Sequence, residues 1–167
     1  MFACEAVDLD FLDAAPLRLR STVNVARPPS EIFAALAHDP ANWGEFFPGF
    51  DRSGRWQTPG PHGVGSRYTK RFIGITIEES VLIWDEGARL AFRVVGTTAP
   101  AFHTWVEDYR FEPDGNRNTV LRVDIGGRPR LAFRLLRPVV PRIFSLLMTR
   151  MGQNLEHGRW FSTQPPG

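Results

Sequence analysis

The chain has one cysteine, Cys4, and one lysine, Lys70, and it lacks closely spaced histidines. A single cysteine excludes an intrachain disulfide and a zinc site built on cysteine ligands. The four histidines lie far apart and show no His-x-x-x-His spacing, so nothing in the sequence indicates a metal site. We therefore expect no metal and no cofactor.

The chain also lacks long runs of basic residues and long uninterrupted runs of apolar residues. The net charge is +2, and no block of five basic residues occurs, so the pI of 9.2 does not indicate a nucleic-acid partner. Four arginines interrupt the apolar stretch 131–151, which excludes stable membrane insertion. The first residues are acidic and carry neither the basic nor the apolar region of a secretory signal. We expect a cytoplasmic protein.

Aromatic residues, in contrast, are abundant. The 167 residues include 13 phenylalanines and 5 tryptophans, which suit either a thick core or the wall of an apolar cavity. The length fits one domain. We predict an N-terminal lead-in over 1–16, a single domain over 17–161 and a frayed C-terminus over 162–167.

The first third of this domain predicts one strand and two short helices. Apolar and polar residues alternate over 17–26, which is typical of a half-buried strand. Pro28-Pro29-Ser30 ends that strand and opens a helix, because proline is tolerated in a first helical turn. A second short helix is expected over 41–47, and a short strand around Arg55 and Trp56.

Residues 66–125 predict an antiparallel meander. Turn-forming residues recur near 73–74, 85–87, 97–100 and 113–118 and separate strand-like runs. If each turn closes a hairpin, the facing pairs can be assigned across all four turns. They include Tyr68 with Glu79, Val81 with Phe92, Ile83 with Leu90, Val94 with His103, Phe92 with Trp105, Leu90 with Glu107, and Tyr109 with Val123.

This register sorts the side chains into two faces. The first face is mostly apolar and includes Tyr68, Phe72, Ile77, Val81, Ile83, Phe92, Val94, Trp105, Tyr109, Val123 and Ile125. The second face receives charged residues, among them Arg67, Arg89, Arg93, Asp108, Arg110 and Arg122. A one-residue slip would scramble the sorting, so we predict a sheet with one core face and one solvated face.

The C-terminal segment supplies a cover for the core face. Residues 128–137 are predicted to form an amphipathic helix, and Pro138 and Pro141 should kink or restart it. Beyond them, apolar residues recur every three or four positions, at Val140, Ile143, Phe144, Leu147, Met148, Met151 and Leu155. The predicted class is α+β with a helix-grip fold. A curved antiparallel sheet of about six to seven strands wraps around a long C-terminal helix, and two short helices follow the first strand.

Several short motifs resemble the Bet v 1-like, START-related superfamily, and in particular its bacterial polyketide cyclase/dehydrase-like subgroup. They are the junction 26–33, Trp43 after the first helix, Gly63-Val64-Gly65-Ser66, Glu79-Ser80-Val81 with Trp84-Asp85, and the strand end Phe111-Glu112-Pro113. The resemblance covers roughly 17–158. It implies a cavity between the sheet and the terminal helix, which relatives use for sterols, lipids, plant hormones or aromatic polyketides. None of these motifs is a catalytic signature.

Four charged or titratable residues fall on the apolar face: Lys70, Glu79, His103 and Glu107. An ionised group there is costly unless it is paired or reaches water. These groups either pair among themselves for structural reasons or orient a ligand in an apolar pocket. Glu79 or His103 could also act as a general acid or base, since burial raises a carboxyl pKa and histidine titrates near neutrality.

The sequence thus predicts binding of a hydrophobic small molecule (lipid, sterol-like or polyketide-like). An aromatase/cyclase-type enzyme is the alternative, and membrane-surface or partner binding through the arginine-rich segment 128–142 is a third hypothesis. Catalytic residues and oligomeric state stay open. The candidate ligand-binding residues are Trp43, Phe47, Tyr68, Lys70, Ile77, Glu79, Val81, Phe92, His103, Trp105, Glu107, Tyr109, Leu147 and Met151.

Overall fold

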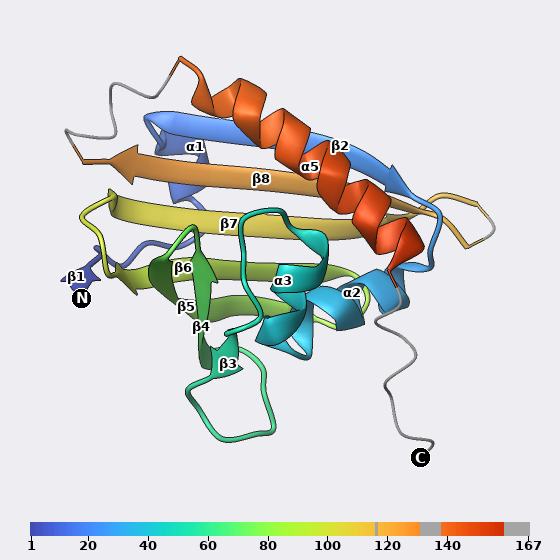
Figure 1. The fold of residues 1–167 in the computed structure, drawn as a ribbon, viewed down its shortest axis with the longest axis horizontal. Helices are drawn as coiled ribbons and strands as arrows, with labels where there is room; N and C mark the ends of the chain where they lie inside the picture. The colour runs from blue at the N-terminus through green and yellow to red at the C-terminus, as the bar shows by residue number, and fades with distance from the viewer. Residues whose placement is uncertain (116, 131–137, 159–167) are drawn as a thin grey trace.

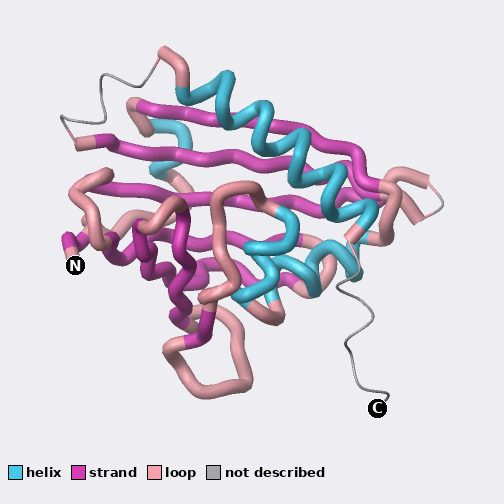
Figure 2. The backbone as a smooth tube through the Cα atoms, viewed as in Figure 1, coloured by secondary structure: helices cyan, strands magenta, loops and turns pink. Residues whose placement is uncertain are grey.

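All strands of the structure belong to one antiparallel sheet (Figure 1). The structure is a computed structural model that describes residues 1–115, 117–130 and 138–158. Its strands are β1 (Phe2–Ala3), β2 (Leu17–Val25), β3 (Arg55–Trp56), β4 (Arg67–Phe72), β5 (Ile75–Asp85), β6 (Arg89–Thr97), β7 (Phe102–Pro113) and β8 (Thr119–Pro129). They follow the order β2-β8-β7-β6-β5-β4-β3, and β1 pairs with β6. In Figure 2, β3 and β4 run steeply across the direction of the other strands, so the sheet is strongly bent.

The helices lie on both faces of this sheet. On the concave face are α2 (Pro29–Ala37), the 3-10 turn η1 (Pro40–Asn42), α3 (Trp43–Phe46) and the long α5 (Val140–His157), which crosses β2, β8 and β7 (Figure 1). The short α1 (Phe11–Ala14) lies on the opposite face, behind β8. This is the predicted helix-grip fold. Its eight strands exceed the expected six to seven because β1 joins the sheet.

The meander register agrees with the prediction at two of its four turns. Tyr68 faces Glu79 between β4 and β5, and Tyr109 faces Val123 between β7 and β8. Between β5 and β6, the predicted pair Val81–Phe92 is present, but the register shifts between Val81 and Ile83. Trp84, and not Ile83, therefore faces Leu90. A bulge of one residue has exchanged the faces of Ile83 and Trp84 relative to the prediction, so that Ile83 now faces Ala91.

Between β6 and β7 the predicted register is wrong by two residues. Phe92 faces Glu107 instead of Trp105, and Leu90 faces Tyr109 instead of Glu107. At the far ends of the two strands, the N-terminal segment enters between them in place of direct pairing. The Cys4 N–H donates to the Val95 carbonyl (2.8 Å), and the Glu5 N–H donates to the His103 carbonyl (2.7 Å). A shift of two residues keeps each side chain on its face.

The second face of the sheet is less exposed than predicted. Ala91 and Val106 are fully buried there, and so is the Asp108 side chain, which pairs with Arg89 and Arg110 at 2.8 and 2.7 Å. The N-terminal segment with α1 covers part of this face, and a Cβ on Gly126 would lie 3.1 Å from that of Ala15. The prediction of one core face and one solvated face is therefore wrong for the centre of the sheet.

The C-terminal prediction divides into three parts. Arg128 and Pro129 belong to β8 and not to a helix, whereas 131–137 lie outside the described residues, as does the predicted frayed end 162–167. The helix from Val140 is present as predicted. It packs closely on β2, because a Cβ on Gly152 would lie only 2.3 Å from Val23 Cγ1.

Candidate functional site

The concave face of the sheet and α5 enclose a cavity of about 630 Å³. The first half of α5 forms its roof, whereas the close contact at Gly152 seals the space under the second half. The sheet forms its floor through β2, β7 and β8, and the segment after α3 closes one side. The lining residues are Leu19, Trp43, Phe47, Pro48, Gly49, Phe50, Phe72, Ile73, Trp105, Glu107, Tyr109, Ile125, Val140, Ile143, Phe144 and Leu147.

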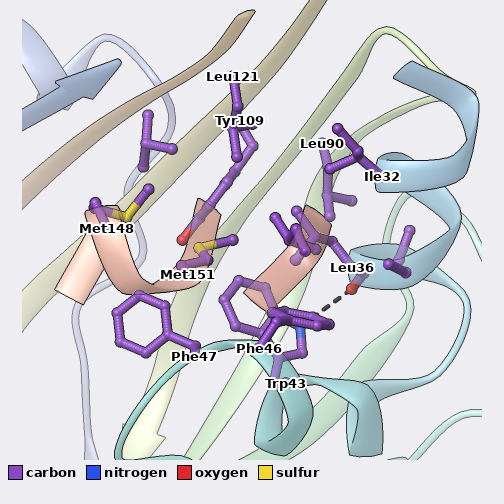
Figure 3. Close-up of a cluster of buried hydrophobic side chains, with 14 of the residues drawn as sticks. Ile32, Leu36, Trp43, Phe46, Phe47, Leu90, Tyr109, Leu121, Met148 and Met151 are labelled. Carbon is purple, nitrogen blue, oxygen red and sulfur yellow. Dashed lines mark hydrogen bonds between the residues drawn. The ribbon is translucent and has the colours of Figure 1, made fainter. Parts of the chain in front are cut away.

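Trp43 connects the short helices to the cavity wall. Its indole Nε1 donates to the Leu36 carbonyl of α2 (3.1 Å), the dashed line in Figure 3. This bond satisfies the one polar atom of a side chain that is otherwise fully buried. Phe47, directly after α3, and Tyr109, on β7, approach the same space, and Met148 and Met151 reach it from α5 (Figure 3).

The segment after α3 is fixed to the turn between β4 and β5. The Ile73 N–H donates to the Gly49 carbonyl (2.8 Å), and Phe50 bridges to Phe72. Gly49 has φ +101°, and a Cβ there would lie 2.4 Å from the Phe72 ring, so this position requires glycine. Ile73 on the turn and Ile143 on α5 are 74% and 52% exposed, and together they mark the cavity mouth.

Glu107 is the single charged side chain among the described lining residues. Trp105 Nε1 donates to its Oε1 and the Tyr109 hydroxyl donates to its Oε2, each at 2.6 Å. Both donors stabilise the ionised carboxylate. Burial, followed by the charge of Glu107, raises the pKa of Tyr109 well above its usual value, so this hydroxyl stays protonated.

Lys70 and Glu79 form a buried ion pair one layer behind the cavity wall. Their side chains are 2% and 1% exposed, and Lys70 Nζ lies 2.9 Å from Glu79 Oε2. The same ammonium lies 3.6 Å from the centre of the Trp43 ring and 4.6 Å from that of Phe92, which places it within an aromatic cage. Burial outweighs the attraction of Lys70 and raises the pKa of Glu79 to about 7.

The structure separates the fourteen sequence candidates into two groups. Six line the cavity: Trp43, Phe47, Trp105, Glu107, Tyr109 and Leu147. Eight do not: Tyr68, Lys70, Ile77, Glu79, Val81, Phe92, His103 and Met151. The predicted row that joined His103 to Glu79 is wrong, because of the shift between β6 and β7.

Ten lining residues were not among the candidates. Phe72 and Ile125 were on the predicted apolar face, and the α5 residues Val140, Ile143 and Phe144 were on the predicted apolar stripe, so a signal for them existed. The irregular segment from Pro48 to Phe50 carries no periodicity that could have indicated it.

The described residues show neither a cluster of metal ligands nor a helix that could span a membrane. Within residues 1–115, 117–130 and 138–158, no three His, Cys, Asp or Glu side chains are grouped so as to hold a metal ion. None of the helices in the described part of the chain is long and apolar enough to span a membrane.

Solved structures share this architecture. A START superfamily protein from Mycobacterium smegmatis matches with a TM-score of 0.69 at 17% identity, covering 87% of this chain and 99% of that one. An aromatase/cyclase from a Streptomyces species matches with a TM-score of 0.66 at 20% identity, covering 85% and 95%. At these identities the matches show the fold alone.

Sequence comparison gives the family. Uncharacterised proteins of Mycobacterium tuberculosis and Mycobacterium bovis are each 32% identical to this chain over 159 residues, covering 93% of it and 92% of the relative. The family model described as polyketide cyclase/dehydrase and lipid transport matches residues 16–156, most of the chain. The chain therefore belongs to the polyketide cyclase/dehydrase and lipid transport family.

Proposed function

We propose that this protein binds a largely apolar small molecule in the cavity between the sheet and α5. The observation that supports this proposal most strongly is the cavity of about 630 Å³, whose sixteen described lining residues include one charged side chain. This volume lies in the range of small-molecule sites, roughly 300–1,000 Å³. Ile73 and Ile143 are lining residues that also reach solvent, so a ligand has a route of entry.

Adjacent leucines on α5 allow a matched test. Leu147 lines the cavity, whereas Leu146 is 70% exposed. Leu147→Trp places a larger ring in the cavity and is expected to weaken binding at least about tenfold. Leu146→Trp should leave binding unchanged. The measurement is a fluorescence titration with the neutral apolar dye N-phenyl-1-naphthylamine, with the fold of each variant checked by circular dichroism. Equal weakening in both variants would count against the cavity as the binding site.

An aromatase/cyclase-type reaction is the second candidate. The observation that favours it is the Tyr109 hydroxyl, 2.6 Å from the Glu107 carboxylate on the cavity wall, an arrangement suited to proton transfer. One of the structural neighbours is itself described as an aromatase/cyclase.

The enzyme hypothesis has its own readout. A linear poly-β-ketone chain would be incubated with the protein, and aromatic product would be followed by absorbance. Glu107→Gln should bind the chain yet lose at least about a hundredfold in turnover if the pair is catalytic. If both proteins form product at the same rate, the Glu107–Tyr109 pair is not catalytic. If no product forms with either, the reaction is not catalysed here and binding alone stands.

A further inference from the structure

Glu107 sets the polarity that a bound molecule meets. Each of its carboxylate oxygens accepts one hydrogen bond from the protein, from Trp105 and from Tyr109. An ionised carboxylate has about four acceptor positions, so capacity remains for a donor on a ligand. The lining around it is aromatic and aliphatic, which strengthens a polar contact by excluding water.

An anionic group would find no counterpart in this lining. The described lining residues include no arginine, lysine or histidine. The indole N–H of Trp105 and the hydroxyl of Tyr109 already donate to Glu107. An anion would therefore lose its hydration without a partner and would face the charge of Glu107 in an apolar space.

The nearest buried cation does not change this balance. Lys70 is paired with Glu79 and lies against the ring of Trp43, which itself forms part of the cavity wall. Lys70 and Glu79 are buried and Glu107 is half-buried on the cavity wall, so this region holds one positive and two negative groups when all are ionised. A hydrogen-bond donor or a cation on the ligand would complement the excess carboxylate, and aromatic rings also favour a cation.

We propose that the cavity selects apolar molecules that carry a hydrogen-bond donor, a hydroxyl or an ammonium group, and that it rejects molecules whose polar end is an anion. The geometry behind this is Glu107 held by Trp105 and Tyr109 in an otherwise apolar lining. The inference rests on the proposed function and specifies the ligand class of the same site.

Three probes with one chain length separate the head groups: 1-decanol below its solubility limit, and decylammonium and decanoate below their critical micelle concentrations. Displacement of N-phenyl-1-naphthylamine from the full chain gives their relative affinities at constant salt. Decanol and decylammonium are expected to bind at least about tenfold more tightly than decanoate. Glu107→Gln keeps an acceptor for Trp105. It should reduce the ratio of the affinities for decylammonium and decanoate at least about tenfold.

A matched control lies on the same strand. Glu112 is 48% exposed and pairs with Arg122, so Glu112→Gln should leave the ranking unchanged. If decanoate binds the unaltered protein as tightly as decanol, the inference is overturned while the proposed function stands. A gap that Glu107→Gln leaves intact also overturns it, because the head group would then remain in water at the mouth. If the dye binds but neither decanol nor decylammonium displaces it, the inference fails as well, and if the dye itself does not bind the protein, the proposed function fails.

Discussion

At pH 8, replacing Lys70 with methionine is expected to lower the free energy of unfolding by about 3 kcal/mol. The change removes the ammonium 2.9 Å from Glu79 Oε2 and leaves a carboxylate that is 1% exposed without its counter-ion. It also removes the cation from the face of Trp43. Equilibrium unfolding in urea, monitored by tryptophan fluorescence, measures the loss.

A double substitution is the control for this prediction. Lys70→Met with Glu79→Gln removes both charges and keeps an acceptor for Tyr68, whose hydroxyl hydrogen-bonds to Glu79. Replacing both members of a buried ion pair is often close to neutral, so the double variant should recover most of the lost stability. A Lys70→Met protein as stable as the unaltered one would contradict the pair described here. A double variant no better than the single one would do so as well.

Stability should fall between pH 5 and pH 8.5 because of Glu79. Burial raises the pKa of this carboxyl from 4.5 to about 7 in the folded chain, so the folded state retains a proton that the unfolded state releases. The resulting stabilisation is fully present below pH 4.5 and is lost as the pH rises through 7. The shift corresponds to about 3 kcal/mol.

The contribution of Glu79 is isolated by comparison with Glu79→Gln. Groups away from this ion pair titrate alike in both proteins, so the difference between their unfolding free energies reports the Glu79 carboxyl together with its partner Lys70. Urea unfolding at half-unit pH steps should show the difference changing by about 3 kcal/mol in the stated direction. A constant difference across the range, or one that changes in the opposite direction, would show that Glu79 is ionised throughout.

Much of the fold follows from local pattern in the sequence. The alternation in 17–26 and the three- and four-residue spacing from Val140 each report one half-buried element, and both elements form as predicted. Hairpins joined by short turns, such as 73–74, also have their predicted register, because a tight turn leaves little freedom for the strands that it joins.

The errors arise where distant segments intervene. Nothing near Phe92 or Trp105 indicates that Cys4 and Glu5 enter between β6 and β7, where the predicted pairs beyond Arg93 are replaced by contacts to this segment. The bulge after Val81 is a local error of a different kind, because the alternation of side chains does not distinguish a regular strand from a bulged one at this point. The register error joined His103 to the predicted site, and Phe50 was missed because its irregular segment shows no periodicity. The place of Glu107 among mostly apolar lining residues could be predicted from the sequence.

The most direct test of the account is an NMR experiment on isotope-labelled protein with 1-decanol. Trp43 and Trp105 line the cavity, whereas Trp56 and Trp84 do not, so their indole signals report the location of the ligand. We predict intermolecular nuclear Overhauser effects from the decyl chain to Trp105, Phe144 and Leu147. Effects confined to exposed residues such as Leu146, or none at saturating decanol, would contradict a ligand cavity between the sheet and α5.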